Sequence, residues 1–168
     1  MSGRKAAPAL YDRGTLVAGR YRIEECLAWG GMGVVYAATH IELGHRVALK
    51  FLRGDLASDH EAIERFLEEA RMAAGFRSEY VAHVLDFGHH EAVPYMVAEY
   101  LEGVDLWTVL DERGELGAGE AADWVAEACA GLAEVHAAGI VHRDLKPENL
   151  FLTRLRDGTT RIKLLDFG

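Results

Sequence analysis

Short β-rich segments punctuated by glycine make up the first half of the sequence. Apolar and β-branched residues cluster in five runs, and Gly88 and Pro94 mark the turn region between the last two. These runs cover residues 21–28, 34–39, 46–51, 84–87 and 95–101. Because short runs bounded by turn residues are typical of paired strands, the pattern predicts a small antiparallel β-rich region.

One amphipathic helix interrupts these strands. Ser58 and Glu61 have the spacing of a capping box, which marks a helix start. Apolar residues then recur at helical intervals as far as Gly75. These residues are Ile63, Phe66, Leu67, Ala70 and Ala74.

Helical periodicity dominates after Gly103. We expect a short helix over residues 105–113 and a longer one over 119–138, which Gly139 ends. The buried stripe of the long helix would consist of Trp124, Ala128, Leu132 and Val135. Two apolar runs, 149–153 and 161–165, then flank Asp157-Gly158 and predict a hairpin. A β-rich region followed by a helical one predicts an α+β fold.

Four motifs stand in order along this framework. Residues 142–149 read His-Arg-Asp-Leu-Lys-Pro-Glu-Asn, and residues 166–168 read Asp-Phe-Gly. Upstream, residues 27–35 read Leu-Ala-Trp-Gly-Gly-Met-Gly-Val-Val and residues 47–50 read Val-Ala-Leu-Lys. The fixed positions of residues 142–149 alone match by chance with a probability on the order of 10⁻⁵ per register.

The motifs resemble the catalytic loop, magnesium-binding turn, glycine-rich loop and lysine strand of the protein kinases. With Phe-Leu-Glu-Glu-Ala-Arg at residues 66–71, the wording is most similar to bacterial serine/threonine kinases of eukaryotic type. The resemblance implies a two-lobe fold with a complete β-rich N-lobe and the first part of a helical C-lobe.

The resemblance also implies a division of the chain. We expect a flexible leader over residues 1–19, an N-lobe over 20–101, and the hinge with a partial C-lobe over 102–168. The family fold continues beyond Asp-Phe-Gly, so the chain is expected to be a truncated kinase domain. Its long helix would then expose apolar surface and lower the solubility.

The activity implied is ATP- and Mg²⁺-dependent phosphoryl transfer to Ser or Thr hydroxyls of a protein substrate. Asp144 would be the base that accepts the hydroxyl proton, and Lys146 would offset charge on the migrating phosphoryl group. Asn149 and Asp166 would hold the magnesium ions, which prefer oxygen ligands.

Lys50 resembles the lysine that grips the α- and β-phosphates, and its carboxylate partner would be Glu69. Glu68 is the rival assignment for that partner. The register of Glu-Ala-Arg favours Glu69.

A further set of residues would bind the nucleotide. They are Leu27, Ala28, Gly30, Gly33, Val35, Ala48, Lys50, Glu99, Leu101 and Asp105. Glu99 and Leu101 would bind adenine through the backbone, and Asp105 would reach the ribose. Ala28 departs from the family pattern because it stands at the first of three usual glycines. Ala98 stands where the family usually has a larger side chain, which limits the pocket behind adenine.

Two other functions remain open. A nucleotide-binding or decoy module could share the fold without catalysis. Retention of Lys50, Asp144, Asn149 and Asp166 favours catalysis over that reading. The second is phosphoryl transfer to a small molecule. The motif Arg-Asp-Leu-Lys-Pro-Glu argues against it, because the related small-molecule enzymes usually lack this motif.

Composition limits the partners, the covalent cross-links and the cellular location that we expect. There are 18 basic and 27 acidic side chains, giving a formal charge of −9, which disfavours binding to nucleic acid or anionic membrane. Cys26 and Cys129 lie far apart, so the sequence indicates neither a disulfide framework nor a zinc site. We expect a cytoplasmic protein without a membrane span in this chain, although a longer parent could be tethered. Nothing in the sequence indicates its oligomeric state.

Overall fold

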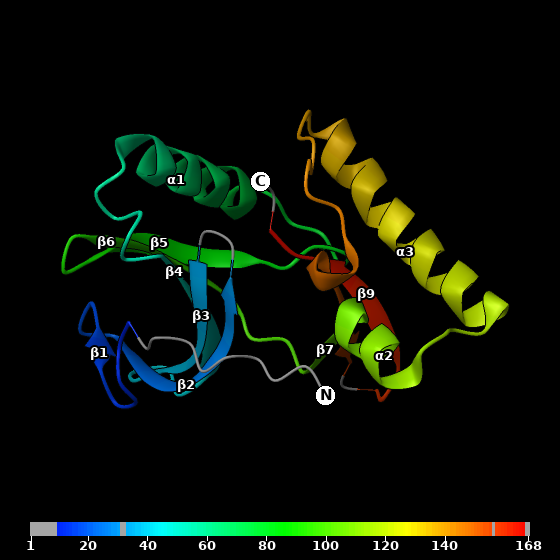
Figure 1. Cartoon of the computed structure of the whole chain (residues 1–168), viewed down its shortest axis with the longest axis horizontal. Coiled ribbons are helices and arrows are strands. Elements are labelled where there is room, and N and C mark those ends of the chain that lie inside the picture. The colour runs from blue at the N-terminus through cyan, green and yellow to red at the C-terminus, as the bar shows by residue number, and fades with distance from the viewer. Residues whose placement is uncertain (1–9, 31–32, 156, 167–168) are drawn as a thin grey trace. The chain divides into compact units, whose positions relative to one another are not determined.

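The computed structural model describes residues 10–30, 33–155 and 157–166, which form two compact units (Figure 1). The first unit comprises Met1–Ala70 and Val84–Tyr100, and the second comprises Arg71–His83 and Leu101–Gly168. The division after Tyr100 falls next to the expected end of the N-lobe. Residues 71–83, by contrast, group with the second unit, where the sequence placed them in the first.

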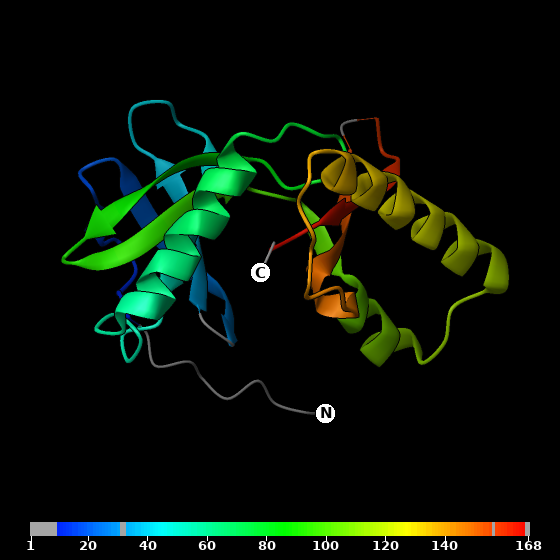
Figure 2. The same cartoon turned by 90° about the horizontal axis from the view of Figure 1, so that it is seen from above.

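An antiparallel sheet of six strands forms most of the first unit (Figures 1 and 2). In spatial order its strands are β1 (Leu16–Val17), β2 (Tyr21–Gly30), β3 (Gly33–His40), β4 (Arg46–Leu52), β6 (Val93–Glu99) and β5 (Val84–His90). The five predicted strands are confirmed, and each predicted boundary lies within three residues of the observed one.

Strand register divides this sheet into two faces, because side chains alternate along each strand. Leu49 on β4 pairs with Tyr36 on β3 and Val97 on β6, and this row lies on the buried face. Lys50 pairs with Val35 and Met96 on the opposite face. The core on the first face consists of Val17, Tyr21, Ile23, Val34, Tyr36, Ala38, Val47, Leu49, Phe51, Tyr95 and Val97.

Leu10, Tyr11 and Val17 pack on this core, although the sequence led us to expect a flexible leader over residues 1–19. Val17 is fully buried, and its strand β1 pairs with β2. The backbone N–H groups of Leu10 and Tyr11 donate to the hydroxyl of Tyr36, at 2.9 and 3.2 Å. The Tyr11 ring lies 4.8 Å from the ring of Phe51. Aromatic packing and two hydrogen bonds therefore hold a segment whose sequence carries no strong periodicity.

Helix α1 (His60–Ala74) forms where the sequence predicts it, but its cap differs. The carboxylate of Asp59, not the hydroxyl of Ser58, accepts hydrogen bonds from the N–H groups of Glu61 and Ala62, at 3.0 and 3.3 Å. An ionised oxygen next to the helix start is stabilised further by the helix dipole. Phe66 is fully buried, as its place in the predicted stripe requires.

The second unit combines helices with a sheet of three strands (Figure 1). Its elements are β7 (Gly103–Asp105), α2 (Leu106–Arg113), α3 (Ala118–Ala137), the 3-10 turn η1 (Pro147–Asn149), β8 (Leu150–Arg154) and β9 (Thr160–Leu164). The predicted helices and the β8–β9 hairpin are confirmed. Strand β7, which pairs with β8, was not predicted, because three residues carry too little periodicity.

Helix α3 packs against β9 and the segment before β5 through Gly131. A Cβ atom at Gly131 would lie 2.8 Å from Cβ of Tyr80 and 3.1 Å from Cδ1 of Leu164, so only glycine permits this approach. Ala128 and Val135 are buried as predicted, whereas Trp124 and Leu132 are only half-buried. The buried face of the helix thus consists of Ala128, Gly131 and Val135, and its closest approach is at Gly131.

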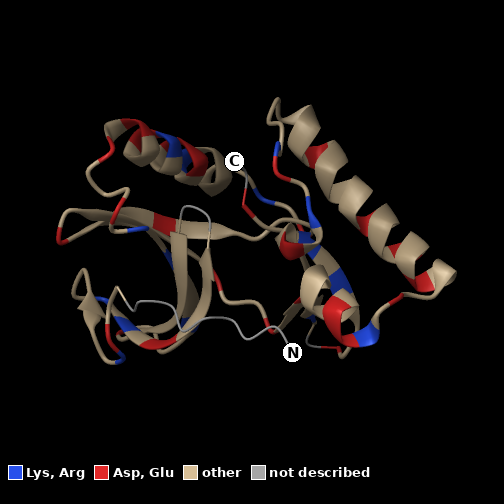
Figure 3. Cartoon of the chain, viewed as in Figure 1, with Lys and Arg blue, Asp and Glu red and all other residues tan. Residues whose placement is uncertain are grey.

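Much of the remaining α3 surface is exposed, and the helix carries acidic side chains but no Lys or Arg (Figure 3). Val125 on this surface is exposed, which agrees with the expected apolar surface of the long helix. Throughout the described ranges, no helix combines the length and apolar character needed to cross a bilayer.

Backbone groups along the outer edge of β9 are bonded to other parts of the second unit. The N–H of Ile162 donates to the carboxylate of Glu127 on α3, at 2.7 Å. The N–H of Leu164 donates to the carbonyl of Tyr80, and the carbonyl of Leu164 accepts from Ala82. These bonds fix the strand whose C-terminal end leads to Asp166.

Candidate active site

A buried ion pair joins the sheet of the first unit to helix α1. The ammonium of Lys50 on β4 lies 3.1 Å from Oε1 of Glu69 on α1. The Lys50 side chain is 17% exposed and that of Glu69 only 6%. Glu68, the rival partner, is exposed. The helical stripe brings Glu69 to the sheet because its neighbours Phe66 and Ala70 are fully buried.

The glycine-rich segment forms the β2–β3 hairpin, in which Gly30 pairs with Gly33. Gly31 and Met32 lie outside the described residues. A Cβ atom at Gly33 would lie 3.0 Å from the carbonyl oxygen of Phe51 and 3.4 Å from Cγ and Cε of Lys50. Glycine at this position therefore lets the hairpin lie against the Lys50 side chain.

Ala28 occupies a strand position opposite Val35, where it is exposed. Extended backbone accommodates alanine as readily as glycine, so its methyl group causes no backbone strain here. The backbone of β2 therefore accommodates alanine at position 28 in place of the usual glycine.

Small side chains continue the sheet face that carries Lys50. Ala48 pairs with Ala37 on one side and Ala98 on the other, in the row next to Lys50. Val35 stands directly opposite Lys50, and Leu27 on β2 is half-buried. The predicted nucleotide contacts of the first unit thus share one sheet, and Gly33 and Val35 lie beside its lysine.

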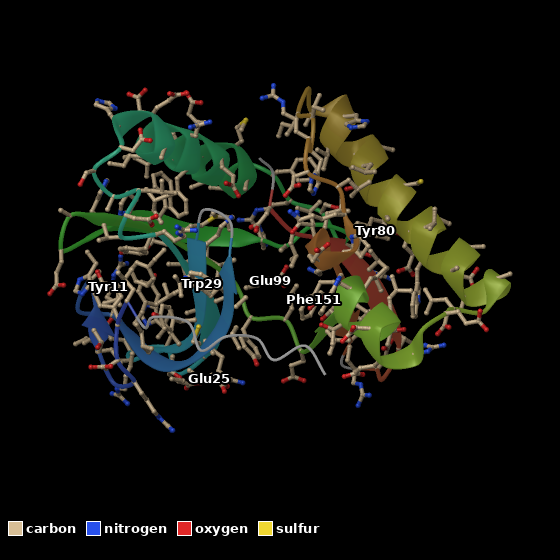
Figure 4. The ribbon with its side chains drawn as sticks, viewed as in Figure 1. Tyr11, Glu25, Trp29, Tyr80, Glu99 and Phe151 are labelled. Atoms are coloured by element: carbon tan, nitrogen blue, oxygen red, sulfur yellow. The ribbon has the colours of Figure 1, made fainter. Side chains whose placement is uncertain are left out.

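The three remaining nucleotide-site predictions fall at or after the end of β6. Glu99, labelled in Figure 4, is the last residue of β6 and pairs with Val47. Leu101 and Asp105 belong to the second unit. The Asp105 carboxylate caps α2 by accepting from the N–H and the hydroxyl of Thr108, both at 2.8 Å. This capping role was missed, although an Asp three residues before Thr at a helix start could have indicated it.

In the second unit, Asp144 lies at the centre of a polar cluster. Its Oδ2 atom is 2.6 Å from the ammonium of Lys146. The amide of Asn149 donates to the backbone carbonyl of Asp144 at 2.8 Å and to Oδ2 at 3.1 Å. The side chains of Lys146 and Asp144 are 45% and 53% exposed, so an incoming substrate can reach them.

Mutual contact keeps both members of this pair charged. The hydrogen bond from Lys146 holds the pKa of Asp144 below its usual value, with a smaller contribution from Asn149. The same bond raises the pKa of Lys146, and the charge of Asp166 adds to that increase. At neutral pH, Asp144 is therefore a carboxylate that can accept a hydrogen bond from a hydroxyl group.

Two contacts anchor the loop to the end of β9. A ring nitrogen of the buried His142, Nε2, lies 2.9 Å from the carbonyl oxygen of Leu165. The N–H of Leu165 donates to the carbonyl of Asn149, also at 2.9 Å. This second bond extends the register of the β8–β9 hairpin by one pair. Asp166, the next residue, is thereby held near Asn149.

Two residues of this region adopt left-handed backbone conformations that are uncommon outside glycine. Arg143 has a φ of 61° and Asp166 a φ of 50°. Such conformations cost free energy and persist where the surroundings impose them, often at functional sites. Here each strained residue lies next to a residue in the His142–Leu165 contact.

Asn149 and Asp166 fit a hard cation through oxygen atoms. Because the NH₂ group of Asn149 donates to Asp144, its Oδ1 atom is the one that could bind a cation. Asp166 is exposed and supplies a carboxylate, while Phe167 and Gly168 lie outside the described residues. Over the described part of the chain, no cluster of three or more His, Cys, Asp or Glu suited to a metal occurs. Mg²⁺ requires no such cluster, because it commonly keeps water and substrate phosphate as ligands.

Comparisons with known proteins identify the family of this chain. The family model described as "Protein kinase domain" matches residues 21–168. Serine/threonine-protein kinase PknA of Mycobacterium tuberculosis is 39% identical over 160 residues, which cover 92% of this chain and 36% of PknA. Serine/threonine-protein kinase pkn3 of Myxococcus xanthus is 38% identical over 156 residues, covering 92% of this chain and 28% of pkn3. The chain thus spans about a third of the length of these curated relatives.

The fold comparison gives the same result. The crystal structure of the Mycobacterium tuberculosis PknI kinase domain matches with a TM-score of 0.79 and 32% identity. The match covers 94% of this chain and 62% of the PknI domain. The predicted α+β kinase fold is confirmed, and the chain belongs to the protein kinase family.

Proposed function

We propose that this chain provides the nucleotide-binding and catalytic-loop residues of a serine/threonine protein kinase that uses ATP and Mg²⁺. The observation that carries the proposal is the pair of prepared lysine–carboxylate contacts, Lys50 with Glu69 and Lys146 with Asp144. Phosphoryl transfer needs fixed cations near phosphate oxygens and a carboxylate that orients the attacking hydroxyl. These two contacts can supply both requirements.

The first unit supports nucleotide binding. Glu69 holds the Lys50 ammonium in one place, which prepares it for the α- and β-phosphates. The adjacent Val35 and Ala48, together with Leu27, offer apolar surface for adenine. Glu99 would contribute backbone hydrogen bonds at the end of β6. The residues of the first unit proposed to hold ATP are Leu27, Ala28, Gly30, Gly33, Val35, Ala48, Lys50 and Glu99. The roles of Leu101 and Asp105 stay predictions from the sequence.

The second unit supports the transfer step. The oxygen of a substrate Ser or Thr would attack the γ-phosphorus, while the bond from that phosphorus to the β,γ-bridging oxygen breaks and ADP leaves. Asp144 would orient the hydroxyl and accept its proton, and Lys146 would offset charge on the phosphoryl oxygens. Asn149 and Asp166 would hold Mg²⁺, which would neutralise phosphate charge.

The class of substrate and the cellular location can be proposed from the same chemistry. The substrate would be a protein that presents a Ser or Thr hydroxyl, and the excess of acidic side chains disfavours nucleic acid as a partner. Both curated relatives are bacterial kinases. We therefore propose that this chain belongs to a bacterial kinase of the cytoplasm that phosphorylates a protein at Ser or Thr.

Calorimetry of Mg²⁺·ATP binding tests the nucleotide half. We expect the wild-type chain to bind ATP and Lys50→Met to lose binding, whereas Lys163→Met, a lysine on β9 outside the proposed site, retains it. Radiolabelled γ-phosphate transfer to a Ser/Thr-containing protein tests the catalytic half, with Asp144→Asn as the inactive variant. Binding without transfer would favour the non-catalytic module, and a folded protein that binds no ATP would overturn the proposal.

A further inference from the structure

Arg46, the first residue of β4, stacks on Tyr100, the residue that follows β6. The guanidinium carbon of Arg46 lies 4.0 Å from the centroid of the Tyr100 ring. This position follows from the register, because Val47 pairs with Glu99 and Arg46 therefore stands beside the next residue along. Cations attract aromatic faces at centroid distances within about 6 Å, so this contact is a close one.

Two carboxylates of β2 hold the same guanidinium. Nε of Arg46 lies 2.9 Å from Oε2 of Glu24, and Nη2 lies 3.2 Å from Oε1 of Glu25. Successive side chains of a regular strand point to opposite faces. A register shift between Ile23 and Glu25 adds one residue to β2, and such a bulge lets both glutamates face one arginine.

A hydroxyl group completes the network. Thr39 on β3 donates to Oε1 of Glu24, and this bond, followed by that from Arg46, lowers the pKa of Glu24. Glu24 is therefore ionised at neutral pH. Glu24 and Glu25 of β2, with Thr39 of β3 bonded to Glu24, thus hold Arg46 of β4. Arg46 in turn stacks on Tyr100, which directly follows Glu99 (Figure 4 labels Glu25 and Glu99).

We propose that Arg46 is a positioning residue for adenine recognition, acting through Tyr100 on the Glu99 backbone. The inference rests on the proposed function, in which that backbone binds adenine. Anchoring the ring of Tyr100 restricts rotation of the peptide that joins it to Glu99, so the Glu99 carbonyl is pre-oriented before the ligand arrives. Pre-orientation increases affinity because less conformational entropy is lost on binding.

Stability alone does not account for the network. The side chain of Arg46 is 41% exposed and that of Glu24 33%, and ion pairs this accessible to water contribute little to folding. Two carboxylates of β2 nevertheless hold the one arginine that stacks on Tyr100, next to the end of the strand proposed to bind adenine. The effect should therefore appear in ligand affinity more than in the melting temperature.

The test compares adenosine with ATP in calorimetric titrations. Arg46→Met should weaken binding of both ligands by the same factor, about three- to fivefold, which is the size of an exposed cation–π contact. Lys50→Met should weaken ATP only, because adenosine has no phosphates. Arg46→Lys, which keeps a cation above the ring, should recover part of the loss.

Arg20→Met is the matched control. Arg20 lies over the Tyr21 ring at 5.2 Å and pairs with Asp86 at 2.8 Å, so it has the same chemistry in the same unit, away from Glu99. We expect Arg20→Met to leave both affinities within twofold. Tyr100→Leu removes the aromatic ring instead of the cation and should reproduce the loss of affinity seen in Arg46→Met.

The outcomes separate this inference from the proposed function. Wild-type protein that binds neither ligand would overturn the proposed function and this inference with it. Wild-type protein that binds both, with unchanged adenosine affinity in folded Arg46→Met and Tyr100→Leu, would overturn this inference alone. An equal loss in Arg20→Met would also overturn it, because the effect would then belong to the whole sheet.

Discussion

Two lysine–carboxylate pairs carry the proposed chemistry, and they are built in opposite ways. Lys50 and Glu69 are 19 residues apart and largely buried, at 3.1 Å. Asp144 and Lys146 are two residues apart and about half exposed, at 2.6 Å. Packing of α1 on the sheet therefore creates the first pair, while a single loop creates the second.

This difference separates two tasks of a phosphotransferase. A buried pair interacts strongly because few water molecules screen it, and it stays in place as long as strand and helix are packed. An exposed pair is screened and can exchange partners at little cost. Lys50 is thus suited to a fixed anchor for phosphate, and Asp144 to a contact that rearranges when a hydroxyl arrives.

The largest expected effect lies in the exposed pair and concerns rate. Asp144→Asn should lower phosphoryl transfer by about 10²- to 10⁴-fold, because the variant cannot accept the hydroxyl proton. Its free energy of unfolding should change by less than about 1 kcal/mol, since the pair is exposed. Transfer assays and urea denaturation measure the two quantities. A variant that loses stability in proportion to activity would contradict the division of tasks.

The next effect concerns the stability of the buried pair. Lys50→Met removes an ammonium from a buried carboxylate and should lower the free energy of unfolding by about 3 kcal/mol. Lys146→Met is the matched variant in the exposed pair and should cost less than about 1 kcal/mol. Urea denaturation of both variants gives the comparison directly. Equal losses would show that burial does not distinguish the pairs.

A smaller effect sharpens the account of the first region. Ala98 lies in the row next to Lys50, opposite Ala48. If this row borders the adenine site as proposed, we expect its small side chains to leave room for nucleotide analogues enlarged at adenine N6. Ala98→Met should weaken such an analogue about tenfold, the size expected of an overpacked site, while ATP affinity changes little. Competition binding measures both. Equal rejection of bulky and ordinary competitors by the two proteins would remove the idea.

The smallest effect is a change in titration. Lys146 holds the pKa of Asp144 below its usual value, so Lys146→Met should return that pKa toward normal. A lowered pKa stabilises the folded state above the usual carboxyl range, and this contribution is lost as the pH falls through the folded pKa. NMR titration of the Asp144 carboxyl carbon follows the shift. An unchanged titration would show that Lys146 does not set the charge of Asp144.

Motif spacing predicted more of the candidate site than periodicity alone could. Lys50 and Glu69 stand on a strand and a helix that periodicity identifies, and motif register selected Glu69 over Glu68. The structure brings these two side chains together, and it groups Asp144, Lys146 and Asn149 in one loop. Their roles in binding and transfer stay predictions.

The missed features depend on contacts between distant parts of the chain. β1 has only two residues, and the segment before it is held by hydrogen bonds from the N–H groups of Leu10 and Tyr11 to the hydroxyl of Tyr36, which no local pattern reports. The choice of Asp59 over Ser58 as cap depends on which oxygen reaches two N–H groups. The close approach of α3 at Gly131 depends on Tyr80 and Leu164, which are distant in the sequence.

The covered edge of β9 also bears on how the chain avoids self-association during folding. An open strand edge is a template on which another chain can add a strand and begin an aggregate. Here the carboxylate of Glu127 accepts a hydrogen bond from the outward N–H of Ile162. The N–H of Leu164 donates to the carbonyl of Tyr80, and its carbonyl accepts from the N–H of Ala82. The bonds that steady the approach to Asp166 thus also close a route to intermolecular β-sheet growth.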